Sequence, residues 1–93
     1  MIHSLMLAAA LGNVTSIEGR VIHISVSSIS VVASHSGAVA PFHLEPYFAD
    51  VFTPNGKTEI PISRVHVGSI VKVFYDTRFT GTRRAERIEL LRP

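Results

Sequence analysis

The sequence predicts a small all-β protein in which five strands close into a barrel and one short helix joins two of them. Three observations support this class. Apolar and polar residues alternate with a period of two along most of the chain after residue 13, which is typical of half-buried strands. Short clusters rich in Ser, Gly, Pro and Asn separate these stretches. The alternation slips by one residue near Val21 and near Glu86, and such an offset predicts a bulge that curls a sheet.

Length and composition predict one domain with little stability in reserve. The chain has 93 residues, of which 46% are hydrophobic and 17% charged. It has no cysteine, so neither a disulfide nor a thiolate metal site supports the core. Below about 80 ordered residues a core alone rarely contributes more than roughly 3–5 kcal/mol. We therefore expect a homo-oligomer, and we expect no stable membrane span because no apolar run is long enough.

Residues 1–13 form an N-terminal apolar segment that precedes the expected barrel domain, residues 14–93. The run from Leu5 to Leu11 consists of helix-forming residues, and the following Gly-Asn pair is a helix stop. The same run resembles the end of a secretory signal, although no Lys or Arg precedes it. Three alternatives stay open: a residual signal, a native helix that packs on the domain, and a disordered tail.

The first three strands are expected in the N-terminal half. The first runs from about Val14 to Ser25, and Gly19 marks a bend within it. The second runs from Ile29 to Ser34 and the third from Ala38 to Leu44. Pro41 lacks the N–H that a sheet needs, which predicts an edge or a bulge in the third strand.

A short helix is expected between the third and fourth strands, from Glu45 to Thr53. Pro46 suits the first position of a helix. The residues that follow it, Tyr47, Phe48, Val51 and Phe52, have helical spacing.

The fourth strand, expected from Ile70 to Asp76, has two apolar faces. Ile70 and Phe74 flank Lys72 on the face opposite the core, and a lone small barrel would leave this outer face in water. Burial of a Phe or Ile side chain contributes roughly 1.5–3 kcal/mol. We therefore expect Leu5 to Leu11 or a second copy of the chain to cover the outer face, with Ile70 and Phe74 as interface candidates. The inward residues are Val71, Val73 and Tyr75.

The last strand is expected from Arg83 to Leu91, with Ala85, Ile88 and Leu90 in the core. The resulting order is three strands, a short helix and two strands. That order is typical of the OB-fold, a five-stranded Greek-key barrel. The sequence thus predicts an OB-like barrel.

A series of spaced residues, mostly apolar residues and glycines, runs through the domain: Ile17-x-Gly19-x-Val21-x-x-Ile24, Ile29-Ser30-Val31, Thr58-x-Ile60, Val65-x-Val67-Gly68-Ser69-x-Val71-x-Val73 and Ala85-x-x-Ile88-x-Leu90. This series resembles that of small bacterial OB-like β-barrel domains of unknown function, which are often exported. The resemblance covers residues 14–91 and departs in the aromatic-rich stretch 45–57. It implies an OB-like fold and an exported or periplasmic location, with a cytoplasmic location as the alternative, and it implies no catalytic residue.

Motifs for catalysis are missing from the sequence. It has no Gly-rich phosphate loop, no His-Glu-x-x-His and no Gly-x-Ser-x-Gly. Five histidines are present, but their spacing does not bring three or four ligands together for a metal. We expect a non-enzymatic binding or structural module with no cofactor and no metal.

The C-terminal third carries most of the positive charge. Residues 64–93 hold seven basic and three acidic side chains (7 − 3 = +4), whereas residues 1–63 hold two and four (2 − 4 = −2). In OB-folds the loop between the last two strands borders the face that binds oligonucleotides, and Arg beside an aromatic residue contacts phosphate while the ring stacks on a base. The alternative is a solvated hairpin whose arginines pair with nearby carboxylates. The candidates for binding nucleic acid or another polyanion are Arg78, Phe79, Arg83, Arg84 and Arg87.

Overall fold

The computed structural model describes residues 14–78 and 81–93, which form an all-β fold. The all-β class predicted from the sequence is confirmed. The strands are β1 (Val14–Ile24), β2 (Ser28–Ala33), β3 (Val39–His43), β4 (Val51–Phe52), β5 (Ile70–Asp76) and β6 (Arg83–Arg92), with 3-10 turns η1 (Pro54–Gly56) and η2 (Ile62–Arg64).

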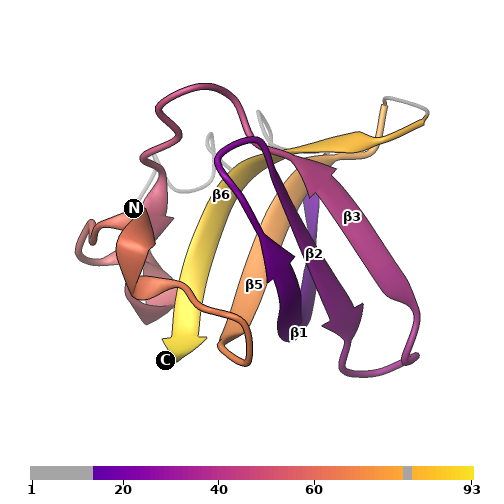
Figure 1. The fold of residues 1–93 in the computed structure, drawn as a ribbon, viewed down its shortest axis with the longest axis horizontal. Coiled ribbons are helices and arrows are strands. Elements are labelled where there is room, and N and C mark those ends of the chain that lie inside the picture. The colour runs from indigo at the N-terminus through magenta and orange to yellow at the C-terminus, as the bar shows by residue number, and fades with distance from the viewer. Residues whose placement is uncertain (1–13, 79–80) are drawn as a thin grey trace, which may run out of the picture.

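Five of these strands close into a ring (Figure 1). The sheet order is β3-β2-β1-β5-β6-β4, and an additional pairing joins β3 to β6. That pairing is parallel, whereas β1 pairs antiparallel with both β2 and β5. The two-residue β4 lies outside the ring and pairs with β6. The predicted closure of five strands is confirmed.

The long strand β1 pairs with two neighbouring strands along different parts of its length. Its first half pairs with β5 and its second half with β2. The register of the β1–β2 pair shifts between Val21 and His23, where the sequence predicts a bulge. Side chains are excluded at Gly19, because a Cβ there would collide with the backbone carbonyl of Val32. The predicted bulge is therefore present, and Gly19 is a position where the neighbouring strand approaches too closely for a side chain.

A second bulge lies in β6. Phe74 pairs with Arg87 and Tyr75 with Ala85, which leaves Glu86 as the extra residue. The extra residue changes the alternation, so that Ala85 and the later Ile88 both point into the ring and are buried. This bulge is the one predicted near Glu86.

The core fills the ring from all five strands. On β5 the inward residues are those predicted, and Tyr75 packs its ring 5.2 Å from that of Phe42 on β3. The fully buried side chains are Val21, Ile29, Val31, Phe42, Leu44, Val51, Ser69, Val71, Val73 and Ile88.

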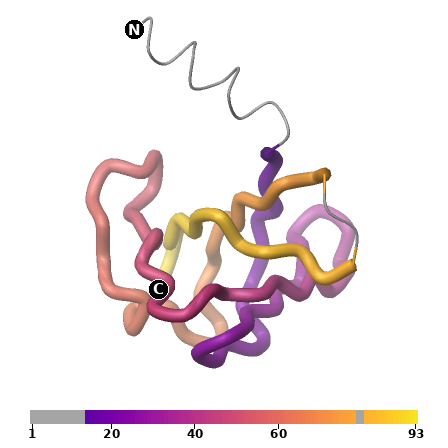
Figure 2. The backbone as a smooth tube through the Cα atoms, turned by 90° about the horizontal axis from the view of Figure 1, so that it is seen from above, coloured from indigo at the N-terminus to yellow at the C-terminus, as the bar shows by residue number. Residues whose placement is uncertain are grey.

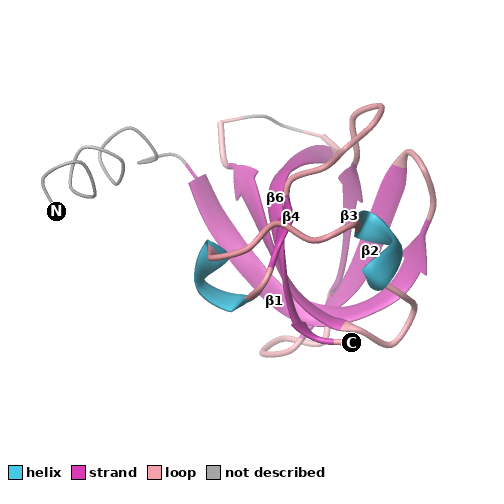
Figure 3. Cartoon of the chain, turned by 90° about the vertical axis from the view of Figure 1, so that its left-hand side faces the viewer, coloured by secondary structure: helices cyan, strands magenta, loops and turns pink. Residues whose placement is uncertain are grey.

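The helix predicted from Glu45 to Thr53 is wrong. The chain instead makes a turn in which the Phe48 N–H donates to the Glu45 carbonyl (3.1 Å), followed by the short strand β4. Tyr47 has a left-handed φ of 59°, which a right-handed helix does not allow. Val51 then pairs with Ile88 of β6 and is buried. The helical turns are η1 and η2, drawn in cyan in Figure 3.

Pro41 pairs with Ser30 of β2 without a register shift, so the bulge alternative is not seen, and β3 has a second neighbour, β6, from Phe42 onward. The Ala33 N–H donates to the Ala38 carbonyl, and the Leu44 N–H donates to the Ser27 carbonyl. Between these two bonds, hydrogen-bonded and non-hydrogen-bonded residue pairs alternate along β2 and β3. Pro41 falls between two hydrogen-bonded pairs, and its nitrogen points away from β2. The missing N–H therefore breaks no hydrogen bond between these two strands.

Candidate functional site

An apolar pocket of about 800 Å³ lies at one end of the ring. Three segments that are distant in sequence form its walls: the loop between β1 and β2, the turn after β3, and η2 with the residue that follows it. We call it the apolar pocket. Its lining residues are Ile24, Ser25, Val26, Ser27, His43, Leu44, Pro46, Tyr47, Phe48, Ile62, Ser63 and Val65.

The first wall is a turn built by serines. Ser25 donates its N–H to the Ser28 carbonyl (2.9 Å), and its hydroxyl accepts from the Ser27 N–H (3.3 Å). Serine hydroxyls that bond nearby backbone groups stabilise turns without glycine. The turn presents Val26 to solvent with 92% of the residue exposed. The serines between the first two expected strands are typical of a turn, but nothing in the sequence pattern predicts an exposed Val there.

The second wall is the turn after β3, which holds Tyr47 in a costly conformation. A left-handed backbone costs an L-residue roughly 1–2 kcal/mol, and it is unusual for a bulky side chain. Tyr47 has φ 59° and is 99% exposed, so burial of its ring does not offset this cost. Its neighbour Phe48 is half-buried and packs against the core. Strained residues of this kind concentrate at functional sites.

The third wall is η2, which is tied to β1 through the following turn. Val65 donates its N–H to the Ile62 carbonyl (2.9 Å), and both side chains contribute to the core or pack against it. Beyond them, Gly68 donates to the Val21 carbonyl, and Val21 donates to the Ser69 carbonyl. These two bonds fix the third wall relative to β1, so the pocket is bounded by anchored backbone on this side.

No Asp, Glu, Lys or Arg lines the apolar pocket. Its polar side chains are one imidazole, that of His43, with serine hydroxyls and the phenol of Tyr47. Ligand pockets typically measure about 300–1,000 Å³ and combine apolar walls with a few polar groups. The volume and chemistry of this pocket therefore suit an uncharged, mainly apolar ligand.

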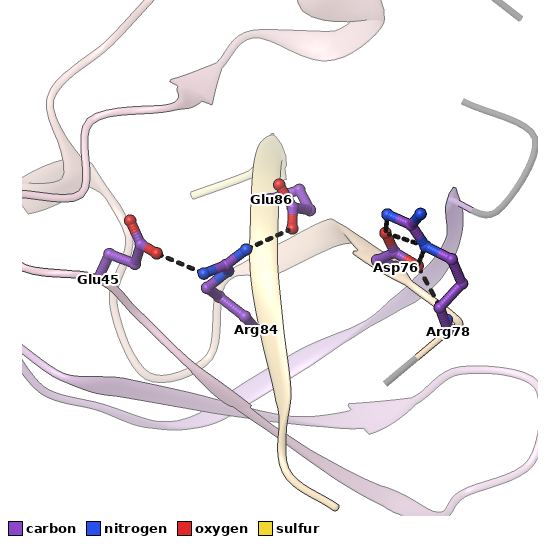
Figure 4. Close-up of polar contacts among 5 residues, drawn as sticks. All are labelled: Glu45, Asp76, Arg78, Arg84 and Glu86. Atoms are coloured by element: carbon purple, nitrogen blue, oxygen red, sulfur yellow. Dashed lines mark hydrogen bonds and ion pairs between the residues drawn. The ribbon is translucent and has the colours of Figure 1, made fainter. Parts of the chain in front are cut away.

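The arginines predicted to bind polyanions lie elsewhere, on β6 and at the end of β5. Arg78 contacts Asp76 through Nε (3.0 Å) and Nη2 (2.6 Å), and Arg78 also donates its backbone N–H to that carboxylate (2.8 Å; Figure 4). These hydrogen bonds hold the pKa of Asp76 below its ordinary value. Phe79, the aromatic partner in the prediction, lies outside the described residues.

The arginines at the start of β6 differ in their surroundings. Arg84 forms ion pairs with Glu45 (2.6 Å) and Glu86 (3.6 Å; Figure 4). Arg83 places its guanidinium 4.8 Å from the centre of the Tyr75 ring. Among the described residues Arg83 makes no ion pair. The structure thus matches the hairpin alternative for Arg84 but not for Arg83.

Arg87 covers the outer face of β5. Its guanidinium lies 4.6 Å from the ring centre of Phe52 and 5.7 Å from that of Phe74. It also pairs with Glu89 (3.5 Å), a buried carboxylate that accepts the Asn55 N–H (3.2 Å). Phe74 is half-buried as a result.

The interface candidates Ile70 and Phe74 are both half-buried on the outer face. Lys72 lies 6.0 Å from the Phe74 ring centre and adds to the cover that Arg87 supplies. The run from Leu5 to Leu11, one of the two predicted covers, lies outside the described residues. An interface through Ile70 and Phe74 stays a prediction.

The described residues offer neither a grouped set of metal ligands nor a membrane-spanning helix. Within residues 14–78 and 81–93, no three His, Asp or Glu side chains are grouped so that they could hold a metal ion. In the same part of the chain, no helix has the length and apolarity needed to cross a bilayer.

No family model, curated protein or solved structure matches the chain. The functional assignment therefore depends on the site itself. The sequence interpretation missed the apolar pocket because it placed Tyr47 and Phe48 on one face of a helix. The signal that could have found it is the pair of large apolar residues, Val26 and Tyr47, in short polar or Pro-containing turns.

Proposed function

We propose that this protein is a non-enzymatic binding module whose binding site is the apolar pocket. The observation that carries this proposal is the rim of the pocket, where Val26 and Tyr47 are almost fully exposed beside an apolar cavity of about 800 Å³. Exposed apolar groups that adjoin a concave apolar surface favour binding, since a ligand removes both from water. The ligand class is an uncharged, mainly apolar group.

The chemistry of the pocket supports a binding role over a catalytic one. Among the residues that line the pocket, His43 is the one whose side chain could act as a general base. No carboxylate lines the pocket to orient its imidazole. The antiparallel β1–β2 and β1–β5 pairs with a parallel β3–β6 closure support the OB-like architecture. OB-folds commonly serve as binding modules.

The test is a titration with Nile red, a neutral apolar dye, monitored by fluorescence in dilute protein. We expect Val26→Glu to weaken binding at least tenfold, because it places a charge at the rim of an uncharged pocket. Val39→Glu is the matched control, since Val39 is also exposed (59%) but does not line the pocket. Equal affinities for the two variants would show that the dye binds elsewhere and that this proposal is wrong.

Polyanion binding is a second candidate, favoured by Arg83. Its exposed guanidinium lies over Tyr75 and has no ion pair among the described residues. An arginine that forms no ion pair can contact a phosphate without first breaking an interaction with a carboxylate.

A further inference from the structure

We propose that the apolar pocket binds the Leu5 to Leu11 run of a second copy of this chain. This inference rests on the proposed function, because it names the ligand of that same pocket. The run contains Leu, Met and Ala residues and no charged or polar side chain. Charged side chains are likewise missing from the lining of the pocket. The two surfaces therefore match in chemistry.

The position of the run in the chain decides which copy supplies it. The run lies outside the described residues, but it joins β1 at Val14 through Gly12 and Asn13. A fully extended chain covers at most about 3.6 Å per residue, so Leu11 lies within about 11 Å of Val14. The complete run, Leu11 included, can enter only a pocket that comes this close to the start of β1.

The chain's own pocket does not come so close. The start of β1 and the loop between β1 and β2 lie on opposite sides of the molecule (Figure 2), which extends 28 Å along its shortest axis. That loop forms the first wall of the pocket. Leu11 thus falls short of its own pocket, so only the pocket of another copy can hold the complete run.

Symmetry then predicts the assembly. Each copy has one run and one apolar pocket. Two copies that exchange runs therefore fill both pockets and form a closed two-fold dimer. If the run is helical, Leu7 and Leu11 are four residues apart and lie on the same face, as groove-binding helices require. The exchange would also bury Val26 and Tyr47, which a single copy leaves in water. It gives a small domain additional buried apolar surface.

The experiment measures the mass of the full-length chain by light scattering across a range of concentrations. We expect twice the monomer mass of 10.1 kDa for the unaltered protein. Leu7→Glu in the run and Val26→Glu at the rim should each give a monomer. Val39→Glu and Phe74→Glu should leave the dimer intact, because neither residue lines the pocket.

Nile red binding separates this inference from the proposed function. In the Leu7→Glu variant the pocket is vacant, so we expect it to bind the dye several-fold more tightly than the unaltered dimer. An unaltered protein that is monomeric, or a Leu7→Glu variant that stays dimeric, would overturn the exchange even if the dye still requires an intact Val26. A dimer that is lost in Phe74→Glu but kept in Val26→Glu would overturn it too, and would place the interface on the outer face. Equal dye affinities of Val26→Glu and Val39→Glu when each is combined with Leu7→Glu, so that both chains are monomers with vacant pockets, would instead reject the pocket itself.

Discussion

Two of the regions that carry apolar side chains outside the closed core differ in what lies over them. On the outer face of β5, Phe74 is shielded by the Arg87 guanidinium, which Glu89 holds in place. At the apolar pocket, the Tyr47 ring and the Val26 side chain stand in water. Among residues 14–78 and 81–93, the first region is covered by the chain itself and the second is not.

An apolar residue on the outside of a sheet does not by itself indicate an interface, because a charged side chain can cover it. A guanidinium over an aromatic ring contributes about 0.5–2 kcal/mol and removes part of the ring from water without a partner molecule. The outer face therefore has less need of a binding partner than its sequence suggests. The pocket has no such compensation, and its rim includes a backbone conformation that costs free energy.

The largest effect is expected when the cover of the outer face is removed. Arg87→Ala leaves the buried Glu89 carboxylate without its ion pair and exposes two aromatic rings, so we expect a loss of about 2–3 kcal/mol in the free energy of unfolding. Urea denaturation measures it. Arg84→Ala is the control, because its partners are partly exposed and such pairs contribute about 1 kcal/mol or less. Similar losses for both variants would mean that Arg87 does not cover the outer face as described.

A gain in stability is expected at the pocket. Tyr47→Gly relieves the left-handed strain and should raise the free energy of unfolding by about 1 kcal/mol, while it weakens Nile red binding. Asn55→Gly is the matched control, because Asn55 is also left-handed (φ 69°) but asparagine tolerates this region. Its gain should be smaller and its dye affinity unchanged. If Tyr47→Gly instead destabilises the fold, the Tyr47 ring contributes to packing and is not held out for a ligand.

Acid should weaken the end of β5 that carries Asp76. Hydrogen bonds from Arg78 lower the pKa of this carboxyl in the folded state. Its contribution to stability is therefore present above its ordinary pKa of about 3.9 and is lost as the pH falls through the lower folded value. Urea midpoints measured from pH 6 to pH 2 should fall more steeply for the unaltered protein than for Asp76→Asn. Parallel curves would contradict the assigned role of this pair.

The smallest effect concerns polyanions. Four available arginines would give single-strand binding a log–log salt slope near −3, since each phosphate contact contributes about −0.7. Arg84 and Arg87 already have carboxylate partners, and Arg78 is bound to Asp76. We therefore expect weak binding with a slope near −1 that Arg83→Ala abolishes, measured by fluorescence anisotropy of a labelled oligonucleotide. A slope near −3 would show that the basic hairpin is the stronger binding surface.

Local patterns in the sequence were enough to predict five of the six strands, the bulges near Val21 and Glu86, and the inward residues of β5. A period of two is visible within β5 itself, and the slips near Val21 and Glu86 mark the positions where the register shifts. The stretch after β3 could not be predicted in the same way. Pro46 and the aromatic spacing satisfy the rules for a helix, whereas the observed turn depends on β4 pairing with β6, a contact between distant parts of the chain.

The apolar pocket escaped prediction for a related reason. Its three walls come from separate segments, and no local spacing relates Val26 to Tyr47 or to Ile62. The arginine candidates were visible in sequence because they are close together in it. Their carboxylate partners were partly visible too, but Glu45 lies far from Arg84 in sequence and meets it only in the fold.

The most direct test of the account is to map where an apolar ligand binds. Backbone amide NMR shifts of the dimer-deficient Leu7→Glu chain would be followed during titration with Nile red. The account predicts that the largest changes fall on the three walls of the pocket, at residues 24–27, 44–48 and 62–65. Changes centred on Phe74 and Arg87 instead, or no saturable change, would contradict it.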